Sequence, residues 1–478
     1  MSTSHTLNEL LAHANAKRDA AQWPQAITAY RQLIELAPHA PELKHNLGLA
    51  YLAFGQPKEA IAHCSAALQA NPQLWQSLII RGKAHKELNL ITQAHADFQN
   101  ALMLNQNNAE ARLALADIAL NEFGEPYTAR DLVKPLHADP DYQMDAQLTT
   151  LMASLYDRPH WNAPAAAQEL SDEIMTFSQE HLRLPELGLP ALKARIGKYR
   201  PRVALLSPQF FMSPVYFLTI TGWRKIAQEC DIVIFNRGNK SDIATQEFKS
   251  LASEWVEVQH MSAVDLARQI HEADIDVLYD LGGWMDPIAL KALSAKPARQ
   301  QFKWVGGQSV TTGLSTFDGW IGDVAQSPKS LQSLYSEPLI QISGSYATYV
   351  PPSYLPKKHR HKSDTPCIFA NPAKVSQPFL ERLRTMPGKK VFIHRQYRHP
   401  QVKERILAGL GDLATAAEFI IPSSHEEALQ AVNAHAVMID TFPYNSGLTA
   451  REALAMGTAI QVLEVGSLFC ERHTAHVA

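Results

Sequence analysis

Proline recurs in the first part of this chain with a period of 34 residues. Pro38 and Pro72 are 34 residues apart, and Pro140 follows after twice that distance, with Gln106 at the intermediate position. Such a period predicts pairs of helices that stack on one another, because a single pair cannot bury its apolar face alone. We therefore expect the chain to begin with an array of helical repeats.

Small residues recur in the same register. Ala26, Ala60 and Ala94 follow the 34-residue spacing, and Gly48 and Gly82 occupy a second small position one helix earlier. Small side chains are needed where the two helices of a unit cross closely. The combination is typical of the tetratricopeptide repeat.

The large position, four residues after the recurring alanine, is aromatic in two units, at Tyr30 and Phe98. We predict three regular units and a degenerate fourth, in which residues 123–126 break the helix pair: 7–40, 41–74, 75–108 and 109–142. The tetratricopeptide region thus spans residues 1–142, and the proline-interrupted residues 143–196 are predicted to be a helical connecting segment.

A stack of such repeats presents a concave groove suited to extended peptides or partner helices. The functional interpretation is that the repeats bind a protein. The alternative is that they only brace the domain that follows.

From residue 200 the pattern changes to short apolar runs separated by helical stretches. Runs at 203–206, 231–235 and 275–279 are followed, after a polar stretch, by a second set: 367–370, 390–393, 418–421, 437–440 and 460–463. Apolar runs of this kind predict parallel sheets covered by helices on both faces. We expect two α/β lobes, 197–355 and 356–478, with a cleft between them, and ligands outside the carboxyl ends of the strands.

Bulk composition narrows the classes of function. A chain of 478 residues is too long for a single hydrophobic core. A formal net charge of -3 gives no overall basic footprint for nucleic acid. The four cysteines have no metal-ligand spacing and fit a reducing compartment, and no run is apolar enough for a membrane span. We expect a cytoplasmic protein with no membrane span and no nucleic-acid partner.

The turn at residues 441–449 is the strongest phosphate-binding candidate from residue types alone. It follows an apolar strand and leads into a helical segment at 450–457, and it contains Ser446, Gly447 and Thr449. Free backbone N–H groups and the positive end of a helix suit a diphosphate. The alternative is that these residues only cap the helix. No GxGxxG or GxxxxGK[ST] motif is present, so a dinucleotide oxidoreductase or P-loop nucleotidase is not supported.

Several segments resemble the O-GlcNAc transferase and SPINDLY-type glycosyltransferases. These are the stretch from Lys296 to Gly306, the Thr311-Thr312-Gly313 loop, Ser327-Pro328 and the run from Tyr335 to Leu339. The loop reads WVGGQSVTTG, which has one extra residue and lacks the proline of the family pattern. Residues 399–416 and 440–444 are also similar to the bacterial cytoplasmic N-glycosyltransferases that modify adhesins. The resemblance covers about residues 200–478 and implies a GT-B fold of two Rossmann-like lobes behind the repeats.

The resemblance also implies roles for individual residues. Lys374, after the strand at 367–370, falls where the family has a lysine that meets the phosphates of the sugar nucleotide, so we expect it to be catalytic. The implied donor site comprises Asn371, Lys374, Ser423, His425, Asn445, Ser446, Gly447, Leu448, Thr449 and Glu452. In it, residues 445–449 hold the diphosphate, Glu452 the ribose, and the loop with Ser423, Ser424 and His425 the uracil. The implied acceptor side comprises Ser213, Gly306, Thr311 and Thr312.

The expected activity is an inverting, metal-independent transfer of a hexose or N-acetylhexosamine from a UDP-sugar to Ser/Thr or Asn of a protein. A lysine and a helix N-terminus can stabilise the leaving diphosphate without metal or cofactor. The DxD string Asp274-Ile275-Asp276 enters a predicted strand, which disfavours a metal site.

Two departures from the family keep other interpretations open. Ser213 stands where the family has a histidine, and the usual helices after the last strand are not seen before Ala478. The alternatives are a catalytically degenerate relative that binds a nucleotide sugar or a partner, and a repeat adaptor whose second half is structural.

Overall fold

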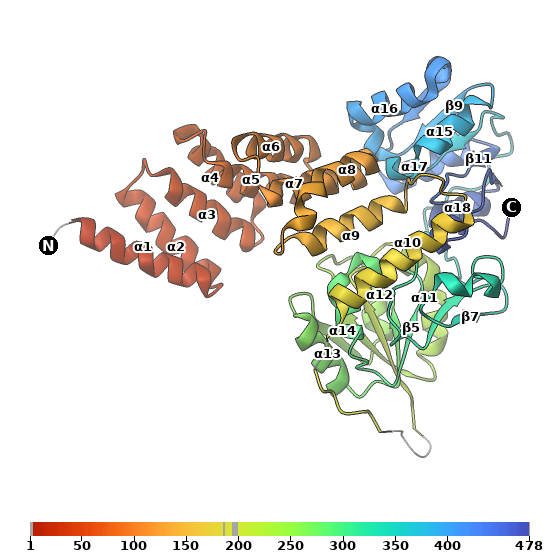
Figure 1. Cartoon of the computed structure of the whole chain (residues 1–478), viewed down its shortest axis with the longest axis horizontal. Helices are drawn as coiled ribbons and strands as arrows, with labels where there is room; N and C mark the ends of the chain where they lie inside the picture. The colour runs from red at the N-terminus through yellow and green to blue at the C-terminus, as the bar shows by residue number, and fades with distance from the viewer. Residues whose placement is uncertain (1–2, 185–186, 194–198, 478) are drawn as a thin grey trace. The chain divides into compact units, whose positions relative to one another are not determined.

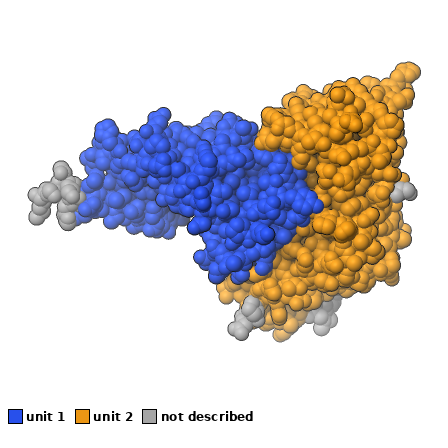
Figure 2. Space-filling view, turned by 45° about the horizontal axis from the view of Figure 1, so that its top comes forward, with its two compact units in different colours: residues 1–150 blue, residues 151–478 orange. Residues whose placement is uncertain are grey.

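The computed structural model describes residues 3–184, 187–193 and 199–477 (Figure 1). The chain divides into two compact units, residues 1–150 and residues 151–478 (Figure 2).

The first unit is a series of helix pairs with the 34-residue register expected from the sequence. The pairs are α1 (Thr3–Asp19) with α2 (Trp23–Leu36), α3 (Pro41–Ala53) with α4 (Pro57–Ala70), α5 (Trp75–Glu87) with α6 (Ile91–Leu104), and α7 (Ala109–Ile118) with α8 (Pro126–Val133). The recurring Ala26, Ala60 and Ala94 are fully buried. A Cβ added to Gly48 would lie 2.5 Å from Cys64 Sγ. Close helix crossing therefore explains the small residues.

The fourth helix pair corrects one expectation. Residues 123–126 do not break the pair but form the turn between its two helices. The π-helical turn η1 (Ala119–Phe123) ends α7 and inserts one residue. The buried alanine of this pair is accordingly Ala129, one position later than the 34-residue register places it.

Helices α9 (Gln143–Ser154) and α10 (Pro164–Phe177) precede the first strand, and the π-helical turn η3 (Ser178–Leu182) ends α10. Ser178 Oγ donates a 2.7 Å hydrogen bond to the carbonyl oxygen of Thr312. Turn η3 is thus packed onto the loop that follows β5 (Gln300–Lys303) in the same unit.

The second unit contains two parallel sheets, as expected from the apolar runs. The first has the order β3-β2-β1-β4-β5-β6-β7 and the second the order β10-β9-β8-β11-β12. The strands of the first sheet are β1 (Arg202–Ser207), β2 (Asp231–Asn236), β3 (Glu254–Glu257), β4 (Val277–Asp280), β5 (Gln300–Lys303), β6 (Gly319–Gly322) and β7 (Leu339–Gln341). Those of the second are β8 (Cys367–Ile368), β9 (Lys390–Ile393), β10 (Ala417–Ile420), β11 (Val437–Ile439) and β12 (Ala459–Gln461).

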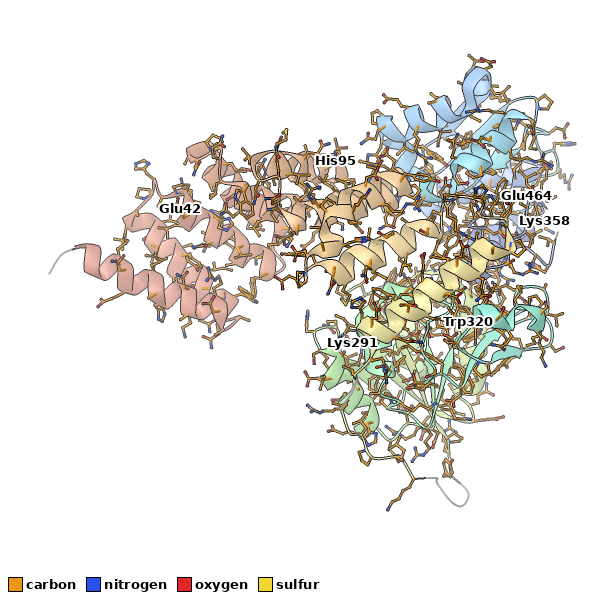
Figure 3. All side chains as sticks on the ribbon, in the orientation of Figure 1. Glu42, His95, Lys291, Trp320, Lys358 and Glu464 are labelled. Atoms are coloured by element: carbon orange, nitrogen blue, oxygen red, sulfur yellow. The ribbon has the colours of Figure 1, made fainter. Side chains whose placement is uncertain are left out.

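The helices that cross over between strands cover these sheets. In the first lobe they are α11 (Pro214–Ile226), α12 (Ile243–Leu251), α13 (Ala263–Glu272) and α14 (Pro287–Leu293). In the second they are α15 (Gln377–Arg384), α16 (Pro400–Leu410), α17 (His425–Asn433) and α18 (Leu448–Ala455). Trp223 and Trp320 are fully buried in the first lobe, and Trp320 is labelled in Figure 3.

The last described residues return to the first lobe. Phe469 packs edge-on against Trp320 with 5.1 Å between ring centroids, and Cys470 N donates a 2.9 Å hydrogen bond to Ser309 O. These two contacts hold the chain after β12 against the first lobe.

Candidate active site

Strand order in the second sheet places one loop pair at a natural ligand site. β8 and β11 are neighbours in the sheet. The next strand after β8 is β9, on one side of this pair, and the next strand after β11 is β12, on the other side. In open parallel sheets this reversal opens a crevice outside the carboxyl ends of the two strands. The loop after β8 carries Lys374, and the turn after β11 carries residues 441–447. The topology therefore brings together two segments that the sequence analysis singled out separately.

Lys374 lies against the turn that follows β11. Its Nζ donates a 2.9 Å hydrogen bond to the carbonyl oxygen of Asn445 and lies 4.3 Å from the ring centroid of Tyr444. Burial lowers the pKa of the Lys374 ammonium to about 8, while the nearby carboxylate of Asp440 acts in the opposite direction. The side chain is a partly desolvated cation beside a helix N-terminus.

The start of α18 provides the second feature of a diphosphate site. Its N-cap residue, Gly447, makes no side-chain capping bond, so the first-turn N–H groups keep their donor capacity. The amides before it are already used, because Asn445 N donates to Cys470 O at 2.8 Å and Ser446 N donates to Asp440 Oδ1 at 2.9 Å. The donors open to a ligand in the cavity are therefore the N–H groups in the first turn of α18, at Leu448 and Thr449, and not the whole of residues 445–449.

Glu452 and His425 form a pair at the other end of the site. The Glu452 carboxylate is fully buried, and its Oε1 lies 2.9 Å from His425 Nε2. The Tyr354 hydroxyl lies 2.9 Å from His425 Nδ1. His425 begins α17 but does not cap it. Ser424 caps α17 instead, by accepting from Glu427 N. A buried carboxylate with spare acceptor capacity suits ligand hydroxyl groups.

These groups line one cavity of about 490 Å³. Of the residues expected at the donor site, the cavity wall includes Asn371, Lys374, Ser423, His425, Leu448, Thr449 and Glu452. Asn445, Ser446 and Gly447 are not in the wall, although Asn445 contacts Lys374 from behind. Pro214, at the start of α11, brings the first lobe to the cavity.

The sequence analysis did not single out His394 and Arg395, which also line the cavity. They follow β9 directly. Their position at the carboxyl end of a strand, where ligands bind in such sheets, is the signal that could have identified them. Gln396 N donates to His394 Nδ1 at 3.3 Å, which places the proton of the neutral ring on Nε2. Burial lowers the pKa of His394 to about 4, with Arg395 and Lys374 adding to the effect. His394 is therefore a neutral N–H donor at neutral pH.

The four residues expected on the acceptor side lie outside the cavity wall. Ser213 is 5% exposed, and its hydroxyl donates to Gln209 O at 2.9 Å. A Cβ on Gly306 would lie 2.0 Å from Leu281 O, so this position requires glycine. Thr311 Oγ1 and Thr312 N both donate to the buried carboxylate of Glu337, each at 2.7 Å. In the structure these residues hold the loops of the first lobe together.

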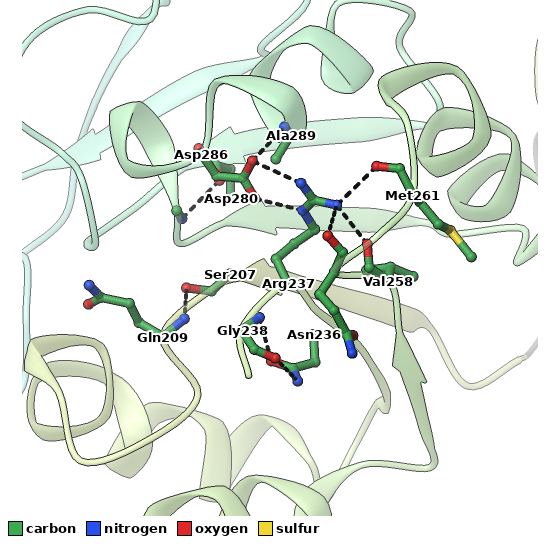
Figure 4. A network of polar contacts seen from close by, with 12 residues as sticks. Ser207, Gln209, Asn236, Arg237, Gly238, Val258, Met261, Asp280, Asp286 and Ala289 are labelled. Atoms are coloured by element: carbon green, nitrogen blue, oxygen red, sulfur yellow. Dashed lines mark hydrogen bonds and ion pairs between the residues drawn. The ribbon is translucent and has the colours of Figure 1, made fainter. Parts of the chain in front are cut away.

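A second polar network fixes the carboxyl edge of the first sheet (Figure 4). Arg237, after β2, pairs with Asp286 through Nε at 2.7 Å and donates to Val258 O at 2.6 Å. Both ion-pair partners are buried. This network therefore connects the loops that follow β2, β3 and β4 with one another.

The Asp274-Ile275-Asp276 string lies at the opposite edge, where β4 begins. Arg299 pairs with both carboxylates, at 2.6 Å to Asp274 and 3.3 Å to Asp276. Both acidic side chains thus contribute to an ion-pair network of the first lobe. Among the residues that the structure describes, none of the helices is long and apolar enough to cross a bilayer.

Comparisons with known proteins agree with this architecture. A tetratricopeptide repeat model matches residues 11–74. Two plant proteins, each named "Probable UDP-N-acetylglucosamine--peptide N-acetylglucosaminyltransferase SPINDLY", match 53% of this chain. The barley protein is 26% identical and the Arabidopsis thaliana protein 24% identical, each over 280 residues. The match spans only 29% and 30% of their lengths, so the chain corresponds to less than a third of these curated relatives.

A solved structure covers almost all of the chain. It is a mutant of the Thermobaculum terrenum O-GlcNAc transferase, 20% identical, which matches 99% of this chain and 86% of that chain with a TM-score of 0.76. This likeness defines the fold as tetratricopeptide repeats followed by a GT-B-type module of two α/β lobes. The resemblance to the O-GlcNAc transferase and SPINDLY group, first drawn from short motifs, is thereby confirmed.

Proposed function

We propose that this chain is a glycosyltransferase that moves a hexose or N-acetylhexosamine from a UDP-sugar to a protein side chain. The observation that carries the proposal is the shared cavity of Lys374 and the uncapped start of α18 at the strand reversal of the second sheet. A cation and a row of free amides are what a departing diphosphate requires. The printed names of the plant relatives support the same class of reaction.

In the proposed step, the acceptor oxygen or nitrogen attacks the anomeric carbon from the face opposite the diphosphate. The bond from that carbon to the diphosphate oxygen breaks, UDP leaves with the bonding electrons, and the proton of the acceptor passes to solvent water. The reaction inverts the anomeric centre. Lys374 and the amides of α18 stabilise the charge that develops on the leaving group, so the step needs no metal or other cofactor.

The nucleoside is proposed to occupy the part of the cavity around Glu452 and His425. The buried Glu452 carboxylate accepts hydrogen bonds from the ribose hydroxyls, and the loop with Ser423 and Ser424 meets the uracil. Support comes from the position of all four residues in the cavity wall. The Glu452 carboxylate also lies 2.9 Å from His425 Nε2.

The acceptor is proposed to approach from the first lobe, past Pro214, with part of the protein held by the repeats. Because Ser213 donates its hydroxyl to a backbone carbonyl, we do not assign it the role of general base. The four cysteines are unpaired, which fits the proposed cytoplasmic location.

The test is to incubate purified protein with UDP-glucose, UDP-galactose and UDP-GlcNAc and to measure UDP release and labelling of added protein. We expect release and labelling with one of the three donors, and loss of both in Lys374→Ala but not in Lys358→Ala, a solvent-exposed lysine of the same lobe. Tight binding without turnover supports the degenerate binding module instead. No binding of any donor or of UDP contradicts the proposed function.

A further inference from the structure

The segment between α9 and α10 lies against the loops that form the proposed diphosphate site. We call residues 155–161 the junction segment. Four of its side chains are buried: Leu155, Asp157, Arg158 and Trp161. A connecting segment that only spanned two helices would be expected to run over the surface, so this degree of burial calls for a role.

Each end of the junction segment contacts the second lobe. Asp157 Oδ2 accepts a 2.9 Å hydrogen bond from Gln377 N, at the start of α15. The ring of Trp161 lies 5.3 Å from that of Phe442, in the turn after β11. These contacts flank the loop of Lys374 on one side and the diphosphate turn on the other.

Arg158 anchors the segment to the chain beyond β12. It pairs with Glu471 at 2.6 Å, and the two side chains are 6% and 0% exposed. Removing one partner from a buried ion pair leaves an uncompensated charge, so this contact holds the segment firmly in place.

Tyr156 is the member of the segment nearest to the proposed chemistry. Its ring stacks on Tyr444 with 5.1 Å between centroids and 15° between planes. The Lys374 ammonium also contacts the Tyr444 ring, 4.3 Å from its centroid. The Tyr444 hydroxyl lies 2.9 Å from Ser309 Oγ of the first lobe. Tyr444 is thus held by Tyr156 on its ring and by Ser309 at its hydroxyl.

We propose that Tyr156 is a positioning residue for Lys374: by holding the Tyr444 ring beneath the ammonium, it sets the place of the site's cation from outside the two sheets. An aromatic face attracts an ammonium most strongly where water is excluded. This inference rests on the proposed function, because it assigns Lys374 to the diphosphate.

Tyr156 does not act on the Lys374 ammonium through its own charge. The charged and titratable groups that act on the ammonium or feel it are Asp440, Cys470, His394 and His473. None of them belongs to the junction segment. Tyr156 acts through Tyr444, and its replacement should therefore matter only where Lys374 matters.

A double-mutant cycle on the full chain tests this coupling. UDP binding is measured by calorimetry for Tyr156→Leu, which keeps an apolar side chain but removes the aromatic face, and for Tyr156→Phe as the matched control. We expect Tyr156→Leu to weaken UDP binding about tenfold in the wild-type background and less than about threefold in the Lys374→Ala background. Tyr156→Phe should bind UDP like the wild type. An equal loss in both backgrounds would overturn the proposal, because it would indicate a purely structural role.

A second readout needs no ligand. The rate at which a small acylating reagent modifies the Lys374 amine is followed by mass spectrometry as a function of pH. We expect a midpoint near 8 in the wild type and in Tyr156→Phe, and a lower midpoint in Tyr156→Leu, because the ammonium loses the aromatic face that stabilises its charged form. If Tyr156→Leu does not fold, Tyr156→Met takes its place, since methionine fills irregular gaps. An unchanged midpoint contradicts the positioning role, whereas failure of the wild type to bind UDP contradicts only the proposed function.

Discussion

Lys374 Nζ donates a 2.9 Å hydrogen bond to the carbonyl oxygen of Asn445. This bond joins the loop after β8 to the turn after β11, the two segments on either side of the strand reversal. It holds the ammonium in the cavity before any ligand arrives. The burial that this position requires disfavours the charged form and lowers the pKa of the lysine to about 8. Preorganised charge of this kind reduces the rearrangement needed when a leaving group develops charge.

Binding of UDP should weaken as pH rises above about 8. The ammonium of free Lys374 is lost above its pKa of about 8, whereas the terminal phosphate of UDP, with a second pKa of about 6, is almost fully charged by about pH 7. Affinity should therefore stay constant from pH 7 to 7.5 and then fall toward tenfold per pH unit. Calorimetric titration at constant ionic strength measures this. Lys374→Arg keeps its charge over the range and should show a flat profile, and a wild-type profile that is equally flat would remove Lys374 from the site.

Glu452→Gln should weaken binding of uridine and of UDP by the same factor, about tenfold, because a charge-assisted hydrogen bond to the ribose becomes a neutral one. The control is Glu426→Gln, an exposed acidic residue in the first turn of α17, which should leave both affinities unchanged. A 2′-deoxy analogue of UDP should lose affinity for the wild type but little for Glu452→Gln. Undiminished uridine affinity in Glu452→Gln would place the ribose elsewhere.

His394 should contribute a neutral hydrogen bond to a bound UDP-sugar. His394→Leu removes the donor and is expected to weaken UDP-sugar binding about fivefold, while His394→Gln, which retains a side-chain N–H, should bind within about twofold of the wild type. With a pKa of about 4, the histidine does not change charge between pH 5.5 and 7.5, so its contribution should be constant there. A contribution that disappears as pH rises through about 6.5 would mean that the imidazolium is the binding form.

Gly48→Ala should destabilise the repeat unit by about 1–3 kcal/mol, because the added Cβ would meet Cys64 Sγ at 2.5 Å. Cys64→Ala removes that sulfur. In the Cys64→Ala background the same glycine substitution should therefore cost clearly less. Urea unfolding followed by circular dichroism measures both values. Identical costs in the two backgrounds would show that the helices do not cross at this point.

Local sequence patterns predicted much of the fold. The 34-residue register located the first three helix pairs because each repeat meets the same neighbours in the same way. The one-residue π insertion at Ala119–Phe123 escaped prediction, since it changes the register without an unusual composition. The short strand β5 was missed because Lys303, a residue typical of surfaces, is fully buried there and donates to carbonyl oxygens of Asp280, Val305 and Gly306.

The candidate site was predictable where a motif or strand end marked it. Lys374 and the turn after β11 follow apolar strands, and the structure brings them into contact. The cavity wall also contains His394, which followed a predicted strand but matched no motif. Tyr156 could not be found in this way, because its stack on Tyr444 joins residues far apart in the chain and leaves no periodic signal.

The most direct test of the account compares uridine with UDP as ligands of wild type and Lys374→Ala. If the cavity neutralises a diphosphate, the two phosphates should improve affinity for the wild type at least about 100-fold over uridine, the gain expected from charge-assisted contacts. In Lys374→Ala that gain should fall below about tenfold, with uridine affinity unchanged. A gain of the same size in both proteins would contradict the central claim that Lys374 and the start of α18 together bind the diphosphate.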